Sequence, residues 1–152
     1  MKLTLRNIRE DDKRMLFDWA NDPETRRQSI STSPITWSTH EKWFADRLRS
    51  ESSRTFVALD AHGHSVGQIR FEKRENFADI GMSIDIKYRG MGFGTAILEE
   101  GCKAIFEEWQ DIAFVLGEVK RDNEPSRMAC LRNGFTEQDP GGEYVVYKKS
   151  RY

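Results

Sequence analysis

The segment best suited to chemistry is Tyr88-Arg-Gly-Met-Gly-Phe-Gly-Thr95, in which every second position from residue 90 is glycine. Because glycine has no Cβ, such a backbone can approach a ligand closely. A helix that begins directly after the loop would point its first free N–H groups, and the positive end of its dipole, toward that ligand. The pattern therefore indicates a site for a phosphate or pyrophosphate group.

Two common phosphate-binding motifs do not fit this loop. A P-loop ends in Gly-Lys-Ser/Thr, which is absent, and a dinucleotide fingerprint reads Gly-x-Gly-x-x-Gly after the first strand of a βαβ unit. Here the glycines are spaced Gly-x-Gly-x-Gly and follow a run of strand-like segments. Further along the chain, a second polar pattern reads Asn123-Glu-Pro-Ser126 and then Asn133-Gly-Phe135.

Together these segments resemble the two signatures of the GNAT superfamily of N-acetyltransferases. Arg89, Gly92 and Gly94 match its acyl-CoA signature, Arg/Gln-x-x-Gly-x-Gly/Ala, and the Asn-x-x-Ser pattern with its closing Gly-Phe matches the second. The resemblance covers essentially the whole chain. It implies a single acetyltransferase domain over residues 1–152, of mixed α/β (α+β) class, with a curved, mostly antiparallel mixed sheet flanked by helices.

The resemblance also implies a reaction and a cofactor site. In this family an amine attacks the thioester of acetyl-CoA directly within a ternary complex, and no metal takes part. We expect the glycine loop to hold the CoA pyrophosphate, the backbone of residues 84–86 to pair with the pantetheine arm, and the second signature to line the far side of the cleft. The expected cofactor-binding residues are Ile84, Ile86, Arg89, Gly90, Met91, Gly92, Phe93, Gly94, Thr95, Asn123 and Ser126.

Two residues are candidates for proton transfer. Asp79 occupies a strand position where several family members carry a glutamate base, although its ordinary pKa of about 3.9 would need raising, or a water relay. Its alternative role is an ion pair with Lys73 or Arg74. Cys130 stands eighth from Asn123, where many relatives carry a tyrosine that protonates the CoA thiolate.

The missing tyrosine leaves the general acid open. A thiol can donate a proton, but a buried cysteine is more often a packing residue. Other possible donors are Tyr88, Tyr144 and Tyr147, and CoA can also leave unassisted.

The acceptor amine is usually selected by the N-terminal helices of the family. Trp19 to Arg26 and Ile35 to Phe44 resemble segments of GNAT enzymes that acetylate nucleotide-linked amino sugars on the route to pseudaminic and related acids. An aromatic face can stack on a sugar or uracil ring, and an arginine can bind a diphosphate. The expected substrate-binding residues are Trp19, Arg26 and His40. Alternatively, Trp19 packs in the core, Arg26 is a solvated loop residue and His40 is a surface or capping residue.

The leading hypothesis is therefore an acetyl-CoA-dependent N-acetyltransferase whose acceptor is a nucleotide-linked 4-amino sugar. Acetylation of protein N-termini or lysines is an alternative. A catalytically silent CoA-binding module is another.

The surrounding pattern predicts the elements that position these residues. Helices begin after Asp12 and near Thr39, Asn21-Asp22-Pro23 ends the first of them, and a polar loop follows over residues 29–34. Strict alternation predicts a strand that places Ile80, Met82, Ile84 and Ile86 on one face. The other predicted elements are strands at 3–8, 54–60, 66–72 and 112–119, helices at 93–109 and after Asn123, and a hairpin from Phe135.

The amino-acid composition bears on which classes of partner the protein could bind. Lys and Arg (24) nearly balance Asp and Glu (25), so no overall positive field favours nucleic acid or an anionic membrane. Cys102 and Cys130 are too few for a disulfide framework, and the three histidines lack further ligands for a metal. No apolar segment resembles a signal peptide or a membrane span, so we expect a cytoplasmic protein with a small-molecule partner. A homodimer is one option that the sequence leaves open.

Overall fold

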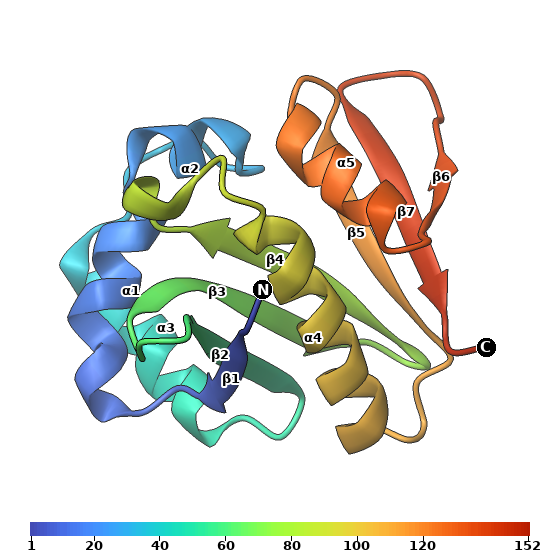
Figure 1. The fold of residues 1–152 in the computed structure, drawn as a ribbon. Helices are drawn as coiled ribbons and strands as arrows, with labels where there is room; N and C mark the ends of the chain where they lie inside the picture. Colours follow the sequence, from blue (N-terminus) through green and yellow to red (C-terminus); the bar gives the residue numbers. More distant parts are fainter.

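A seven-stranded sheet forms the centre of the computed structural model, which describes residues 1–152 (Figure 1). The strands run β1-β2-β3-β4-β5-β7-β6 across the sheet, and only the β4–β5 pair is parallel. This is the mixed, mostly antiparallel sheet expected from the sequence. The strands are β1 (Thr4–Asn7), β2 (Ser53–Leu59), β3 (Ser65–Lys73), β4 (Phe77–Ile84), β5 (Phe114–Lys120), β6 (Thr136–Gln138) and β7 (Tyr144–Ser150).

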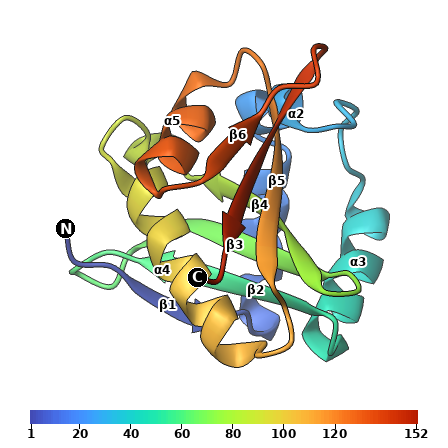
Figure 2. The ribbon, with the colours of Figure 1, turned by 90° about the vertical axis from the view of Figure 1, so that its right-hand side faces the viewer.

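Helices cover both faces of this sheet. Figure 2 shows α4 and α5 on one side and α2 and α3 on the other. None of the helices combines the length and the hydrophobicity that a membrane span requires. The helices are α1 (Lys13–Ala20), α2 (Pro23–Gln28), α3 (Trp37–Arg49), α4 (Phe93–Glu108) and α5 (Glu124–Arg132), with short 3-10 turns η1 (Glu10–Asp12) and η2 (Ile86–Tyr88).

The N-terminal region contains three helices rather than the two predicted. Asn21-Asp22-Pro23 does end α1, but the same residues begin α2, because the Asp22 side chain accepts a hydrogen bond from the Thr25 N–H (3.1 Å) and Pro23 occupies the first helical turn. The predicted helix near Thr39 is α3, which begins two residues earlier, at Trp37, because the Thr36 side chain caps it.

Two apolar cores hold the layers together. The larger packs α4 against the sheet through side chains such as Ile69, Phe71, Ile97 and Ile105, all fully buried. At Gly101 a Cβ would stand 2.6 Å from Ile69 Cδ1, so any larger residue would force the Ile69 side chain or α4 to move. The smaller core joins α1 and α3 to the opposite face through Leu16, Trp19, Phe44 and Val57.

The alternation of β4 is confirmed, except at its end. Ile80, Met82 and Ile84 pack against the larger core, as predicted. The prediction that Ile86 continues this face was wrong: the strand ends at Ile84, and the Ile86 side chain is 67% exposed. The cause is Asp85, whose carboxylate accepts a hydrogen bond from the Lys87 N–H (2.9 Å) and so starts the η2 turn.

Candidate active site

The two parallel strands at the centre of the sheet separate along their length. Pairing between β4 and β5 ends at Asp79 and Leu116, although β4 continues to Ile84 and β5 to Lys120 (Figure 1). At Gly117, the next residue of β5, a Cβ would meet no atom within 4 Å. The separated strands therefore leave backbone groups and space for an extended ligand that pairs with a strand edge.

The glycine loop lies directly beyond the open end of β4. None of the backbone N–H groups of residues 90–95 donates a hydrogen bond within the chain. Gly90 and Gly92 have φ values of +76° and +88°, which side chains other than glycine rarely adopt. Gly92 caps α4 without any side-chain hydrogen bond, so the helix N-terminus is free to bind an anion. We call residues 90–95 the anion cradle.

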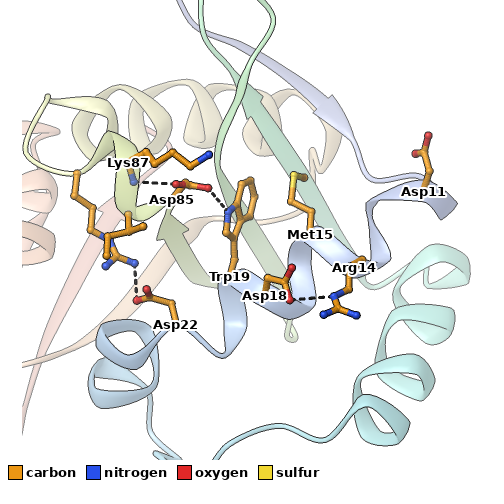
Figure 3. A pocket seen from close by; sticks show the side chains of 10 residues that line it. Asp11, Arg14, Met15, Asp18, Trp19, Asp22, Asp85 and Lys87 are labelled. Atoms are coloured by element: carbon orange, nitrogen blue, oxygen red, sulfur yellow. Dashed lines mark hydrogen bonds and ion pairs between the residues drawn. The ribbon is translucent and has the colours of Figure 1, made fainter.

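The Arg89 side chain faces the N-terminal helices. Its Nε donates to the Ile84 carbonyl (3.0 Å) and its Nη2 to Asp22 Oδ2 (2.7 Å), the contact marked by the dashed line at Asp22 in Figure 3. Burial acts to raise the pKa of Asp22, but hydrogen bonds from Arg89 and the Thr25 N–H outweigh it, and the pKa is lowered. Arg89 thus ties the cradle to α2 with its guanidinium, and its contact with CoA stays a prediction.

A second tie joins the same segment to α1. Trp19 Nε1 donates to Asp85 Oδ2 at 2.8 Å, across a hollow of about 550 Å³ between α1 and η2 (Figure 3). Trp19 is only 8% exposed, so most of the indole packs in the smaller core while one edge reaches this hollow. The hollow is lined by Asp11, Arg14, Met15, Asp18, Trp19, Asp22, Asp85, Ile86, Lys87 and Arg89.

The other two expected acceptor residues do not line this hollow. Arg26 donates to the carbonyls of Ala20 (2.6 Å), Ser31 (3.1 Å) and Ser33 (3.2 Å), so it organises the loop after α2 and is not a solvated side chain. His40 is 3% exposed and its Nε2 lies 2.8 Å from the Lys13 carbonyl. Burial lowers the pKa of His40, which therefore stays neutral inside an aromatic cluster.

Asp79 is the last β4 residue that pairs with β5, so it lies where the strands begin to separate. Its Oδ2 is 2.6 Å from Arg74 Nε, and its side chain is 38% exposed. This ion pair is one of the two alternatives that the sequence left open. No other carboxylate or histidine is placed beside it by a hydrogen bond.

Cys130 is a poor candidate for the general acid. It is 7% exposed within the larger core, and burial raises the pKa of its thiol to about 12. An ordinary thiol has a pKa of about 8.5, so Cys130 would be a weaker acid than the thiol it has to form. The Tyr147 hydroxyl already donates to Glu137 (2.5 Å) and accepts from Arg127 (2.8 Å). Tyr88 lies beside the cradle, edge-on to the Phe93 ring.

The second signature, Asn123 to Phe135, contacts the first turns of both α4 and α5. Asn123 Oδ1 accepts from the Ser126 N–H (3.3 Å) and caps α5. Asn133 Nδ2 donates to the Thr95 carbonyl (3.1 Å) and so joins the end of α5 to the start of α4. In the sequence Asn133 is visible only as part of a pattern, because its hydrogen-bond partner Thr95 is 38 residues away.

Comparison with known proteins agrees with this geometry. Residues 2–136 match the family described as "Acetyltransferase (GNAT) domain". No curated protein sequence matches. Among solved structures, the chain is similar to a spermidine N-acetyltransferase from Vibrio cholerae in complex with CoA and spermine, with TM-score 0.82, 18% identity and coverage of 96% of this chain and 92% of that one.

Two further structures are similar over nearly their whole length. A putative phosphinothricin N-acetyltransferase gives TM-score 0.79 at 23% identity, covering 99% of both chains. An aminoglycoside acetyltransferase in complex with coenzyme A and kanamycin gives TM-score 0.82 at 18% identity, covering 99% of this chain and 95% of that one. At these identities the likeness shows the fold. Because the family match spans most of the chain, and because the cradle and the separated strands are in place, the protein belongs to the GNAT family of acetyltransferases.

Proposed function

We propose that this acetyltransferase moves the acetyl group of acetyl-CoA onto the primary amine of a small molecule, and that the acceptor is a nucleotide-linked 4-amino sugar. The observation that carries the transferase proposal is the anion cradle, whose unpaired N–H groups lie just beyond the open end of β4. Structural neighbours described as spermidine and aminoglycoside acetyltransferases also use small amines.

The cofactor would occupy the space between the separated strands. The CoA pyrophosphate would accept hydrogen bonds from the N–H groups of residues 90–95, where the dipole of α4 adds a favourable positive potential. The amide-containing pantetheine arm would pair with the free edge of β4, and the missing side chain at Gly117 leaves room beside it. This arrangement would bring the thioester to the region where β4 and β5 separate.

The reaction would be a direct transfer. The amine nitrogen attacks the thioester carbonyl carbon, the carbon–sulfur bond breaks, and the thiolate leaves with a proton from the surroundings. Holding amine and thioester in contact supplies much of the rate enhancement. Since the Asp79 carboxylate is already paired with Arg74, we propose water as the immediate acceptor of the amine proton.

The nucleotide-sugar acceptor is supported by fewer residues than the sequence suggested. Trp19 has one edge in the hollow between α1 and η2, which also contains Lys87, a cation without an ion pair. Arg14 in the same hollow is bound to Asp18 at 3.1 Å. An aromatic edge beside Lys87 is suited to a sugar ring that bears a phosphate, although four aspartates also line the hollow. Arg26 and His40 are engaged with backbone carbonyls and contribute no support.

The proposal is tested by release of free CoA thiol from acetyl-CoA with three amine classes: nucleotide-linked amino sugars, polyamines and amine-bearing peptides. Trp19→Phe keeps an aromatic ring in the smaller core but removes the Nε1 donor, so it is the matched control for Trp19→Ala. Turnover restricted to amino-sugar nucleotides, and lost in Trp19→Ala, is the expected result. Turnover restricted to peptides would indicate a protein acetyltransferase instead, and tight CoA binding without turnover would indicate a silent module.

A further inference from the structure

Arg70 occupies an unusual position on the face of the sheet opposite α4. Its neighbours on β3, Ile69 and Phe71, are fully buried against α4, so strand alternation directs Arg70 to the side covered by the N-terminal helices. The guanidinium extends across β4. A Cβ at Gly81 would stand 2.9 Å from Arg70 Cζ and 3.0 Å from its Nε, so the absence of a side chain at Gly81 makes this position available.

The half-buried Arg70 has no carboxylate partner. Comparable arginines are satisfied: Arg89 by Asp22, Arg127 by Glu137, and Arg26 by three carbonyls. Arg70 makes one hydrogen bond, from Nη1 to the Gln68 amide oxygen at 3.2 Å, in the amide orientation that its neighbours favour. Because a guanidinium carries five N–H donors, most of its capacity is unused within the chain.

Charges of both signs surround Arg70. Burial lowers the pKa of Arg70, Glu72 opposes that shift, and Arg47 and Arg26 add to it as like charges. The one acid that acts on it, Glu72, is itself bound by Arg47 at 2.8 Å. Arg47 is also bound to Asp46 at 2.9 Å, and only its Nε lacks a hydrogen-bond partner. Arg70 is therefore the arginine of this group whose donors are largely free, and a guanidinium with free donors is suited to an anion.

This group lies close to the proposed site of acetyl transfer. Arg70 pairs in register with Gly81, which is two residues past Asp79, the last β4 residue joined to β5. The guanidinium therefore crosses β4 where the two strands have begun to separate. It does so on the face opposite α4, which is the face that α1 and α3 cover.

We propose that Arg70 binds a carboxylate or phosphate group of the acceptor, so that the substrate is an amine bearing an anionic group. This inference rests on the proposed function and deepens it. A nucleotide-linked sugar satisfies it, and so does an amino acid, whereas polycations such as spermine and kanamycin would be repelled by these arginines.

The test uses the full chain saturated with CoA. Because CoA carries no acetyl group, this complex can bind an amine without acetylating it. Calorimetric titration compares two matched pairs: 4-aminobutyrate with butylamine, and glucosamine 6-phosphate with glucosamine. A hydrogen-bonded charge pair predicts about tenfold to hundredfold tighter binding of the anionic member of at least one pair. The pair that responds distinguishes a carboxylate from a phosphate.

Substitutions test whether Arg70 causes the tighter binding of the anionic probe. Arg70→Gln should reduce the preference to about one, Arg70→Lys should keep part of it, and Arg49→Gln, at an exposed arginine with no ion pair, should leave it unchanged. CoA affinity should be the same in all of these proteins, which also verifies that they fold. Equal binding within both pairs, no measurable binding of either anionic probe, or a preference that survives in folded Arg70→Gln would overturn the proposal. Anion preference without acetylation of any amine would contradict the proposed function and leave the Arg70 site standing, whereas acetylation without the preference would contradict Arg70 alone.

Discussion

Gly92→Ala tests the cradle directly. Gly92 has φ +88°, and a Cβ there would meet only Met1 Cε at 3.7 Å, an ordinary contact. The cost of the substitution is therefore conformational rather than steric, about 1–2 kcal/mol for an L-residue in the left-handed region.

This conformational cost can lower either the free energy of unfolding or the affinity for CoA. If the loop keeps its conformation in the free protein, the free energy of unfolding falls by about 1–2 kcal/mol. If the loop relaxes, the cost is transferred to binding, and the dissociation constant of CoA rises by about 5- to 30-fold, since 1.4 kcal/mol is a factor of ten. The two changes should together account for about 1–2 kcal/mol.

Gly63→Ala is the matched control. Gly63 has φ +82° and open space around a Cβ, but it lies in the hairpin between β2 and β3. It should lose similar stability in urea unfolding and bind CoA normally by calorimetric titration. Equal weakening of CoA binding in both variants, or no change of either quantity in Gly92→Ala, would refute the assignment of the cradle.

Three further predictions concern the site residues. Cys130→Ala should change kcat by less than about tenfold, below the 10²- to 10⁴-fold effect of losing a general acid, because burial raises the pKa of its thiol to about 12. Asp79→Asn should likewise reduce kcat by less than about tenfold in steady-state kinetics, since its carboxylate is paired with Arg74. Asp22→Asn should lower the free energy of unfolding at neutral pH by about 1–3 kcal/mol, because Arg89 loses its partner. The folded-state pKa of Asp22 lies below the unfolded value of about 3.9, so this contribution is present above about pH 4 and is lost as the pH falls through the folded pKa.

Each of these has a clear contrary result. A hundredfold or larger fall in kcat for either Cys130→Ala or Asp79→Asn, with unchanged CoA binding, would establish that residue as a proton-transfer group. For Asp22, urea unfolding of wild type and variant is compared at neutral pH and near pH 3. A stability difference that is as large in acid as at neutral pH would contradict the role of the carboxylate charge.

The fold could be predicted well from local patterns. Strict alternation identified β4, and the apolar surface of the segment from Phe93 identified α4, because burial on a sheet imposes these periods. Boundaries were less predictable where one residue had two roles. Asp22 follows α1 and caps α2, and Asp85 continues the alternation while its side chain starts a turn.

The site was predictable only where the backbone forms it. The glycine pattern located the cradle, because positive φ values favour glycine and glycines are visible in the sequence. Side-chain roles depended on distant partners: Trp19 with Asp85, Asn133 with Thr95, and Arg70 over Gly81. No local pattern predicts such contacts, so the hydrogen bonds of Arg26 to its own chain and the position of Arg70 were not foreseen.

The most direct test of the account is to incubate the protein with acetyl-CoA and the amine panel, and to quantify free CoA thiol and acetylated amine together by mass spectrometry. We predict equal amounts of both products with at least one small primary amine, and at acetyl-CoA concentrations below the dissociation constant we predict that Gly92→Ala protein forms them more slowly, in proportion to its weaker CoA binding. Acetyl-CoA binding with no acetylated product from any amine, or thiol release without acetylated amine, would contradict it.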